Sequence, residues 1–363
     1  MGKINVALLM GGKSAEHEVS LRSAHNVYQA MDKSQFGVCL IGIDKAGIWR
    51  QYPEDQYILF PDDPNQTQLP PGGQEVYLQA RDGQTWLKST DGAQQTPIEV
   101  VFPVMHGNYG EDGVLQGILR GLEVAFVGAD VLASSVGMDK EIAKKLWRDA
   151  GIPIAQFVTI HRHKKDQFSY DAITRKLGSP VFVKPANAGS SVGVHKVSSP
   201  EQWEAALADA FQYDRKVLVE EAIVGREVEV SVLGNEYPRA SVVGEIVAQN
   251  SFYSYEAKYI QADGAKLVIP AEISEKASQL IRETAILAYE TLQVEGLSRV
   301  DFFLKADDTL VINEINTMPG FTKISMYPKM WEAAGLPYTE LITELIQLAQ
   351  ARHARQKALK TSH

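Results

Sequence analysis

This chain has almost no cysteine, no excess of basic residues and no long hydrophobic run. Cys39 is the only cysteine in 363 residues, which excludes an intramolecular disulfide and a cysteine-based metal cluster. It lies in the apolar run VCLIGI, so we expect a small buried side chain there. The apolar run near the N-terminus, residues 6–12, is too short for a signal peptide.

The charge balance is acidic, because 36 Lys and Arg stand against 45 Asp and Glu, for a formal net charge of −9. Nucleic acids and anionic membranes both attract a basic face. No run approaches the roughly 18 consecutive apolar residues of a membrane span. We therefore expect a cytoplasmic protein with no nucleic-acid partner and no membrane partner.

The chain does contain an alternation of strands and helices typical of an α/β fold. With 363 residues, 45% of them hydrophobic, it is long enough for roughly two to three domains. Strands predicted over residues 3–10, 36–43 and 99–104 indicate a parallel sheet, and Ser14 is the candidate cap of the first helix. The stretch 44–97 carries one predicted hairpin with an Asp-Gly turn.

Gly151 and Pro153 end a predicted helix and mark a candidate domain boundary, after which we expect short antiparallel strands. Aromatic residues gather in one predicted loop, residues 249–267. The predicted strands cover residues 180–185, 216–221, 226–233 and 239–247, and the predicted helices cover residues 14–31, 139–150, 201–211, 272–292 and 338–351.

Two carboxylates meet in the segment RVDFFLKADDTLVINEINTMPG, which predicts two strands joined by a short loop. If residues 306–309 form a four-residue loop, Lys305 pairs with Leu310 and Asp301 lies opposite Glu314. The same register sets Arg299 opposite Asn316. Directly opposed carboxylates require a positive charge between them, and oxygen ligands from Asp301, Glu314 and Asn316 suit Mg²⁺. A solvated polar hairpin face is the alternative.

Phosphate-binding features lie upstream of this hairpin. Lys184 ends a predicted strand and precedes PANAGSSVGV, whose small residues let backbone amides approach a polyphosphate. Lys140 is a second candidate cation, and the spacing excludes a Walker-type P-loop. The segment from Glu220 to Ile223 could offer backbone groups to an adenine edge, and Glu227 could accept ribose hydroxyls. For the strand of Glu227, an exposed acidic face is the alternative.

The loop after the first strand, GGKSAEHE, lacks the glycine spacing of a dinucleotide site. Glu16 would repel an anion there, so the loop suits a cationic group such as an amino-acid ammonium, with a simple strand-to-helix turn as the alternative. His106 ends a strand at the same expected sheet edge, where α/β sheets bind ligands. It is either a substrate contact or a structural histidine.

In chain order, MDK, VKPANAGSSVG, VEEAIVGREVEV, YEAKY, RVDFF and NEINTMPGFT closely resemble an ATP-grasp ligase, specifically of the D-alanine–D-alanine ligase family. The resemblance includes the opening GGKSAEHEVS and the segment HGNYGEDG, and so covers nearly the whole chain. It implies an α/β (α+β) fold of the ATP-grasp type: a Rossmann-like parallel-sheet domain, residues 1–125, followed by two mixed or antiparallel α+β domains. These cover residues 126–217 and 218–363, the last with a lid loop over residues 249–267.

The resemblance further implies ATP as cofactor, with two Mg²⁺ ions for which Mn²⁺ can substitute, and a homodimer that joins two D-alanine molecules through an acyl phosphate for peptidoglycan precursors. The implied catalytic residues are Glu16, Ser190, Tyr259, Arg299 and Gly320. The implied nucleotide-binding residues are Lys140, Lys184, Gly189, Ser191, Glu220, Glu221, Ala222, Ile223, Glu227 and Lys258. The implied substrate-binding residues are Glu16, His106, Arg299, Gly320, Ser325 and Met326, and the implied metal ligands are Asp301, Glu314 and Asn316.

Two alternatives stay open. A D-alanine–D-lactate ligase differs in its nucleophile, and Lys258 with Tyr259 matches the dipeptide-forming pattern better. A non-catalytic ATP-grasp nucleotide sensor would not need the metal ligands together with Arg299 and Glu16. The stretch 44–97 and the pair Asn187-Ala188 depart from the family pattern, and neither coincides with an expected catalytic position.

Overall fold

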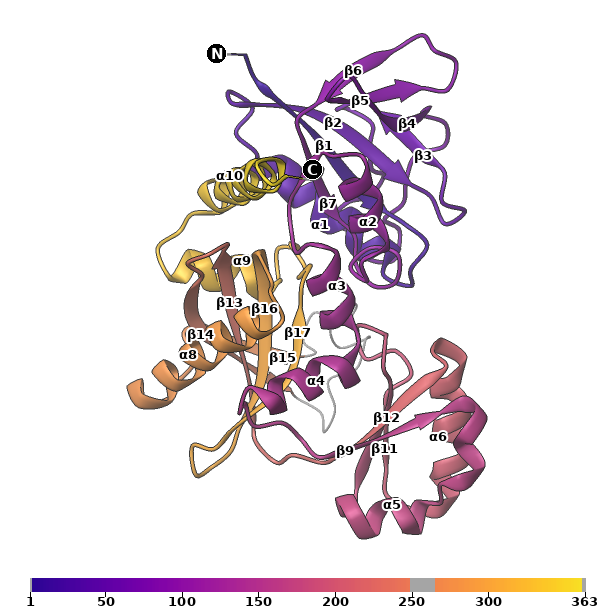
Figure 1. Cartoon of the computed structure of the whole chain (residues 1–363), viewed down its shortest axis with the longest axis vertical. Helices are drawn as coiled ribbons and strands as arrows, with labels where there is room; N and C mark the ends of the chain where they lie inside the picture. Colours follow the sequence, from indigo (N-terminus) through magenta and orange to yellow (C-terminus); the bar gives the residue numbers. More distant parts are fainter. Residues whose placement is uncertain (1, 249–264, 361–363) are drawn as a thin grey trace.

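The computed structural model describes residues 2–248 and 265–360, which form three β-sheets and their covering helices (Figure 1). The first sheet has the order β6-β5-β4-β3-β2-β1-β7-β8. Its centre is parallel as predicted: β1 (Ile4–Gly11) pairs with β2 (Phe36–Ile43) and β7 (Val100–Val104), and β7 pairs with β8 (Ala125–Phe126).

The stretch between β2 and β7 extends this sheet with antiparallel strands, so the sheet as a whole is mixed. These strands are β3 (Trp49–Tyr52), β4 (Gln74–Arg81), β5 (Gln84–Ser89) and β6 (Gln95–Ile98). The predicted Asp-Gly hairpin joins β4 to β5. Asp82 and Gly83 both have positive φ, 54° and 75°, as a tight hairpin turn requires.

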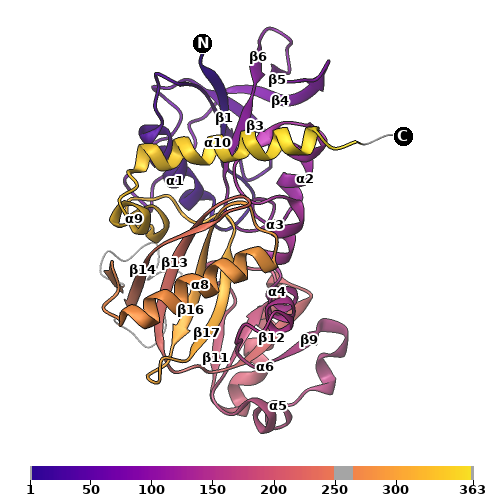
Figure 2. The same ribbon diagram turned by 60° about the vertical axis from the view of Figure 1, so that its left-hand side comes forward.

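Helices cover both faces of the first sheet. Helix α1 (His17–Ala30) packs with β1 on one face, and α2 (Val114–Gly121) contributes to the cluster on the other. Helix α10 (Tyr338–Lys357), predicted to end near residue 351, runs across the α1 face although it is the last element of the chain (Figure 2). Its buried Leu341, Ile342 and Leu345 belong to the same core cluster as Leu8.

The second sheet is antiparallel as predicted, in the order β11-β10-β12-β9. Its strands are β9 (Phe157–His161), β10 (Val181–Pro185), β11 (His195–Val197) and β12 (Lys216–Glu221). The 3-10 helix η1 (Arg162–Gln167) follows β9, and α5 (Tyr170–Leu177) and α6 (Pro200–Tyr213) pack on the sheet. Buried Trp203 and Phe211 of α6 fill this core.

The third sheet, β15-β14-β13-β16-β17, is also antiparallel. Its strands are β13 (Arg226–Gly234), β14 (Arg239–Ala248), β15 (Ala265–Val268), β16 (Gly296–Leu304) and β17 (Leu310–Asn316). Helices α3 (Val131–Met138), α4 (Lys140–Asp149), α8 (Glu275–Thr291) and α9 (Met326–Ala333) surround it. The predicted loop 249–267 is wrong at its end, because Ala265 begins β15, and the rest of it lies outside the described residues.

The register of β16 and β17 differs from the prediction next to their connecting loop and agrees with it at the end away from the loop. Leu310 pairs with Leu304 and not with Lys305, so the loop is one residue longer than predicted. A bulge then shifts the register between Asp301 and Phe302. The two deviations cancel, and Asp301 lies opposite Glu314 as predicted.

Helix α1 begins later than predicted. Its N-cap is Glu16 and not Ser14, whose hydroxyl instead accepts a hydrogen bond from the Glu16 amide at 3.2 Å. We propose that the chain has three domains, as expected from the sequence, but with different limits. Boundaries after residues 125 and 217 would divide strands β8 and β12, so the limits must lie outside these strands. Among the described residues, no helix has both the length and the apolar character needed to cross a membrane.

Candidate active site

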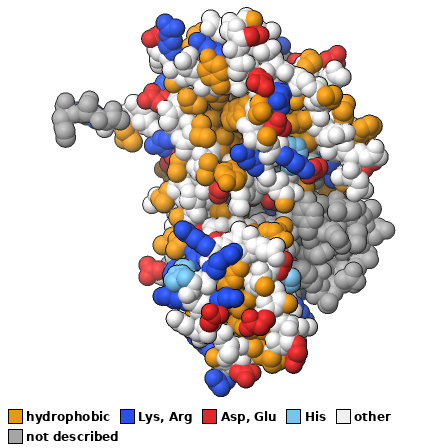
Figure 3. Space-filling view, turned by 90° about the vertical axis from the view of Figure 1, so that its right-hand side faces the viewer, with side chains coloured by type: hydrophobic (Ala, Val, Ile, Leu, Met, Phe, Trp, Pro, Cys, Tyr) orange, Lys and Arg blue, Asp and Glu red, His pale blue; other side chains and the backbone are white. Residues whose placement is uncertain are grey.

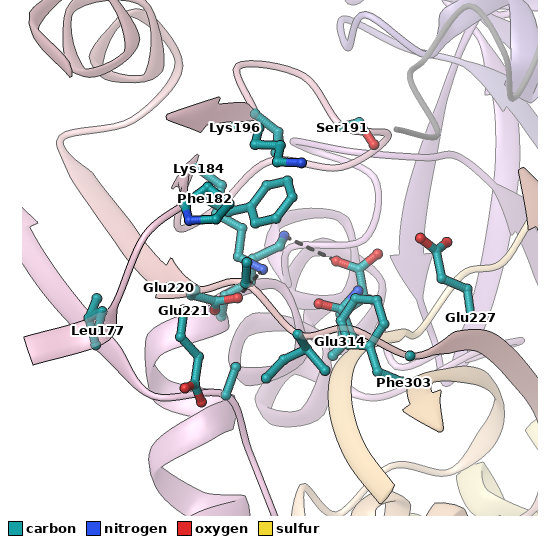
Figure 4. A pocket seen from close by; sticks show the side chains of 18 of the residues that line it. Leu177, Phe182, Lys184, Ser191, Lys196, Glu220, Glu221, Glu227, Phe303 and Glu314 are labelled. Carbon is teal, nitrogen blue, oxygen red and sulfur yellow. Dashed lines mark ion pairs between the residues drawn. The ribbon is translucent and has the colours of Figure 1, made fainter. Parts of the chain in front are cut away.

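A cavity of about 760 Å³ lies between the second and third sheets (Figure 4). Its volume is in the range of pockets that hold small molecules and cofactors. The segment after β10, the end of β12 and the facing strands β13, β16 and β17 supply its walls. The cavity is lined by eleven of the predicted residues: Lys140, Lys184, Gly189, Ser190, Ser191, Glu220, Glu221, Ala222, Ile223, Glu227 and Glu314.

Among the described residues, three lysines line the cavity, Lys140, Lys184 and Lys196, and the two predicted ones come from different elements. Lys140 begins α4 directly after Asp139, whose carboxylate accepts hydrogen bonds from the amides of Glu141 and Ile142. Its Nζ lies 3.6 Å from Glu314 Oε2 and donates to the Ala188 carbonyl at 2.7 Å. Lys184 on β10 lies 2.6 Å from Glu220 Oε2. Lys140 therefore contacts the loop predicted to hold phosphates, whereas Lys184 pairs with Glu220 at the cavity wall.

The walls also carry aromatic side chains that sequence reasoning did not select. Phe182 lies opposite Glu220 in the β10–β12 pairing, and Phe303 of β16 lines the opposite side of the cavity (Figure 4). Flat apolar walls beside a few polar groups suit a purine base. In the sequence both phenylalanines look like ordinary core residues of alternating strands.

Glu221 has a different environment from Glu220. Its Oε1 accepts a hydrogen bond from the Gln156 amide at 2.8 Å, and Figure 4 shows its side chain directed away from Glu220. Sequence reasoning placed both glutamates together at the nucleotide. The structure separates their side chains, because neighbouring residues of a strand point to opposite faces.

Three acidic residues occupy paired positions on three neighbouring strands of the third sheet. Glu229 of β13 lies opposite Asp301 of β16, which lies opposite Glu314 of β17. Arg299 neutralises two of them: its Nε lies 2.9 Å from Glu229 Oε2, and its guanidinium donates two hydrogen bonds to Asp301 at 2.8 and 2.7 Å. Asn316 Nδ2 donates to Asp301 at 3.1 Å. Glu229 was not predicted, although its alternation in REVEVSV could have identified it.

The metal prediction can be tested on these donors. Within the described ranges no group of three His, Cys, Asp or Glu side chains is close enough to hold a metal ion. Asp301 and Glu314 with the Asn316 amide nevertheless supply oxygen atoms from adjacent strands, which is the donor chemistry that Mg²⁺ prefers. The residues present therefore fit the ion.

Glu16, at the start of α1, links the first sheet to the cavity. The Ser190 hydroxyl donates a hydrogen bond to its carboxylate. Ser190 and Ser191 both have left-handed backbones, with φ of 51° and 60°. Gly107 has a φ of 71°, which favours glycine, and a Cβ there would lie 2.5 Å from Glu16 Oε2, so a larger residue would displace the Glu16 carboxylate.

His106 is buried with both ring nitrogens engaged by the protein. Nδ1 lies 2.9 Å from the Met318 carbonyl oxygen and so carries the proton, while Nε2 lies 3.3 Å from the Ser23 hydroxyl. The same hydroxyl accepts from the Phe321 amide at 3.2 Å. Burial lowers the pKa of His106. His106 therefore fastens the segment that contains Gly320, and direct substrate contact stays a prediction.

Ser325 lies directly over Gly320. A Cβ at Gly320 would stand 2.8 Å from Ser325 Oγ, which accepts from the Thr322 amide at 2.9 Å. Met326 begins α9, whose N-terminal amides favour a negative group. The structure therefore brings Gly320, Ser325 and Met326 together, while the binding of a carboxylate by Ser325 and Met326 and of an oxyanion by Gly320 stay predictions.

Glu111 is a buried carboxylate that sequence reasoning missed. Its Oε1 accepts a hydrogen bond from the Gly107 amide at 2.8 Å. Burial, and then the nearby charge of Glu16, raise the pKa of Glu111 to about 8. The residue is consequently protonated near neutral pH. The acidic pair in HGNYGEDG was the sequence signal that could have identified Glu111.

The predicted Lys258 and Tyr259 lie outside the described residues.

The sequence matches two families, described as the N-terminus and the C-terminus of D-ala D-ala ligase, over residues 5–129 and 146–347. D-alanine–D-alanine ligase A of Escherichia coli (strain K12) is 51% identical over 363 residues, 100% of both chains. D-alanine–D-alanine ligase of Proteus mirabilis is 48% identical over 362 residues, 99% of each chain.

Solved structures agree. The D-alanine-D-alanine ligase from Coxiella burnetii is 34% identical, covers 98% of this chain and 97% of its own, and has a TM-score of 0.82. The VanG D-Ala:D-Ser ligase from Enterococcus faecalis is also 34% identical, covers 96% and 100%, and has a TM-score of 0.83. The fold and the cavity, with these likenesses, define an ATP-dependent ligase of the ATP-grasp class. The chain belongs to the D-alanine–D-alanine ligase family.

Proposed function

We propose that this chain joins two D-alanine molecules to D-alanyl-D-alanine at the expense of ATP, for cell-wall precursors. The observation that carries the proposal is that family similarity extends over the whole chain while Ser190 connects the cavity to Glu16. A phosphate site and an ammonium site thus meet, as required when ATP activates the carboxylate of an amino acid. The carboxylate of the first D-alanine attacks the γ-phosphorus and displaces ADP. The amine of the second then attacks the carbonyl carbon of the acyl phosphate, so that the peptide bond forms as inorganic phosphate and a proton are released.

At the nucleotide end, Lys140 and Lys184 supply fixed positive charge for the phosphates. Phe182 and Phe303 cover the faces of the base, the backbone of Ala222 and Ile223 meets its edge, and Glu227 accepts from the ribose hydroxyls. Asp301, Glu314 and Asn316 would hold Mg²⁺, which neutralises charge on the phosphates when bound. All of these residues except Asp301 and Asn316 border the same cavity.

At the substrate end, Glu16 pairs with the ammonium of the first D-alanine. Arg299 and the Gly320 amide stabilise the oxyanion that forms during attack on the acyl phosphate. Ser325 and the Met326 amide hold the carboxylate of the second D-alanine. The roles of Lys258 at the γ-phosphate and of Tyr259 beside Ser190 stay predictions, as does closure of a lid.

The experiment is a coupled assay of ADP and phosphate release with ATP and Mg²⁺, in which D-alanine, L-alanine, D-serine and D-lactate are offered singly, and each of the last three also together with D-alanine. We expect release with D-alanine alone and a product with the mass of D-alanyl-D-alanine. Faster product formation from D-alanine with D-lactate or D-serine would identify a ligase with another nucleophile. Binding of ATP without D-alanine-dependent release would identify a nucleotide sensor.

We also propose that the enzyme is a homodimer and works in the cytoplasm, where ATP is available. Exposed apolar side chains on α2 and α3, those of Val114, Ile118 and Leu132, support an interface between two copies. Figure 3 shows hydrophobic side chains gathered on the corresponding half of the molecule. An isologous contact of this face would remove them from water.

A further inference from the structure

Lys144 is a fully buried lysine behind the wall of the cavity. It lies on α4 four residues after Lys140, so both side chains leave the same face of the helix. Lys140 reaches the cavity, whereas Lys144 is 0% exposed and is not one of the described lining residues. A lysine is almost never buried this completely without a charged partner.

The partner is Glu220. Lys144 Nζ lies 3.3 Å from Glu220 Oε1, and within the described part of the chain neither atom makes a hydrogen bond. The other oxygen, Oε2, lies 2.6 Å from Lys184 Nζ (Figure 4). The Glu220 carboxylate therefore pairs with two lysines, with Lys184 on the cavity side and with Lys144 on the side away from the cavity.

This cluster has one positive charge more than negative when all three groups are ionised. Burial lowers the pKa of Lys144, and Glu220 opposes that shift. Burial alone would raise the pKa of Glu220, but Lys144 and Lys184 together hold it below its usual range. An incoming polyphosphate competes with Glu220 for Lys184, because Lys184 is the lysine of this pair that borders the cavity. Once Lys184 has turned to the phosphates, Lys144 is the lysine that still pairs with Glu220.

We propose that Lys144 is a positioning residue of the nucleotide site, which keeps Glu220 ionised and oriented after Lys184 turns to the phosphates, so that Glu220 selects a 6-amino purine over a 6-oxo purine. The proposal rests on the proposed use of ATP. An ionised carboxylate accepts a hydrogen bond from an exocyclic amine and repels the carbonyl oxygen that a 6-oxo purine carries in its place. Lys144 acts only through Glu220, since Lys144 itself does not border the cavity.

The test compares the affinities for ATP and ITP, which carry the same phosphates and ribose and differ in the base. Mg²⁺-nucleotide binding to the full chain is measured by calorimetry, and the KM and kcat of ligation are measured in parallel. We expect Lys144→Met to lower the ATP:ITP affinity ratio about tenfold or more, the scale of one hydrogen bond to a charged group. The KM for D-alanine should stay within about threefold.

Lys145→Met is the matched control. Lys145 is adjacent on α4, half-exposed, and paired with Glu141 at 2.6 Å. Its removal should leave the ATP:ITP ratio unchanged. Equal weakening of ATP and ITP by Lys144→Met, or no weakening of either, would overturn the proposal, because a merely structural lysine does not discriminate between bases.

If Lys144→Met does not fold, Glu220→Gln and the double variant Lys144→Met/Glu220→Gln decide the question. Both should have the same reduced ATP:ITP ratio, since Lys144 has no carboxylate left to hold. Ratios that differ by more than about threefold, or a wild-type ratio in Glu220→Gln, would refute the inference. A wild-type protein that prefers ATP to ITP but makes no D-alanyl-D-alanine would refute the proposed function alone.

Discussion

Ser190 and Glu16 are joined by a side-chain hydrogen bond although 174 positions separate them in the sequence. Glu16 belongs to the start of α1 beside the first sheet, and Ser190 belongs to the loop after β10 of the second. The contact joins the proposed ammonium site to the loop predicted to bind phosphates. A substrate held by Glu16 would therefore lie next to the nucleotide, which is the condition for phosphoryl transfer between them.

We expect Glu16→Gln to raise the KM for the first D-alanine about tenfold to a hundredfold, because a charge-assisted contact to its ammonium is lost. The KM for ATP should change less than about threefold. Steady-state kinetics with each substrate varied in turn measure both. Glu18→Gln is the control, because Glu18 lies on α1 close to Glu16 but its carboxylate pairs with Lys45. Equal increases in both constants would make Glu16 a structural residue.

Glu314→Gln should reduce turnover at least about a hundredfold while the protein stays folded, because the variant keeps the shape of the side chain and removes a negative charge from the proposed metal ligands. Activity is measured over a range of Mg²⁺ concentrations, and folding by circular dichroism. Asp308→Asn removes an exposed charge from the turn between β16 and β17 and should behave as wild type. Wild-type activity of Glu314→Gln at ordinary Mg²⁺ would contradict the metal assignment.

Glu111 predicts a specific dependence of stability on pH. Its pKa is about 8 in the folded protein and 4.5 ordinarily, so the folded state keeps a proton that the unfolded chain releases between these values. This contribution to stability is complete below about pH 4.5 and is lost as the pH rises through 8. Glu111→Gln imitates the protonated form and should escape the loss.

The measurement is thermal unfolding of wild type and Glu111→Gln at several pH values between 5 and 8. The Tm of wild type should fall progressively relative to that of the variant as the pH rises. Glu332→Gln, which removes an exposed carboxylate of α9, should follow wild type throughout. A constant difference between wild type and Glu111→Gln would show that Glu111 does not titrate in this range.

If the proposed homodimer forms through α2 and α3, Ile118→Asp should convert it to monomer, because Ile118 is 51% exposed in the single chain and a charge in an apolar interface is strongly unfavourable. Sedimentation velocity measures the assembly state. Leu287→Asp, at a 44% exposed position on α8, tests whether any new surface charge has this effect. A dimeric Ile118→Asp would place the interface elsewhere.

Local patterns were enough to predict most elements of secondary structure. The apolar runs of β2 and β12 coincide with the predicted strands, because side-chain alternation and flanking turn residues are local properties. The opposition of Asp301 and Glu314 was also predicted. It survived an error in loop length because the bulge at Asp301/Phe302 compensated, and a bulge depends on neighbouring strands that a two-strand argument does not contain.

By itself, the sequence determined the alternation of strands and helices, the cations and carboxylates available for phosphate chemistry, and the family. Only the tertiary structure decided which of these groups share an environment. It placed α10 on the first sheet, aligned Glu229 with Asp301, and enclosed Glu111 and Lys144. Burial and long-range pairing change the pKa and the partners of a side chain, and both depend on packing between segments that are distant in the sequence.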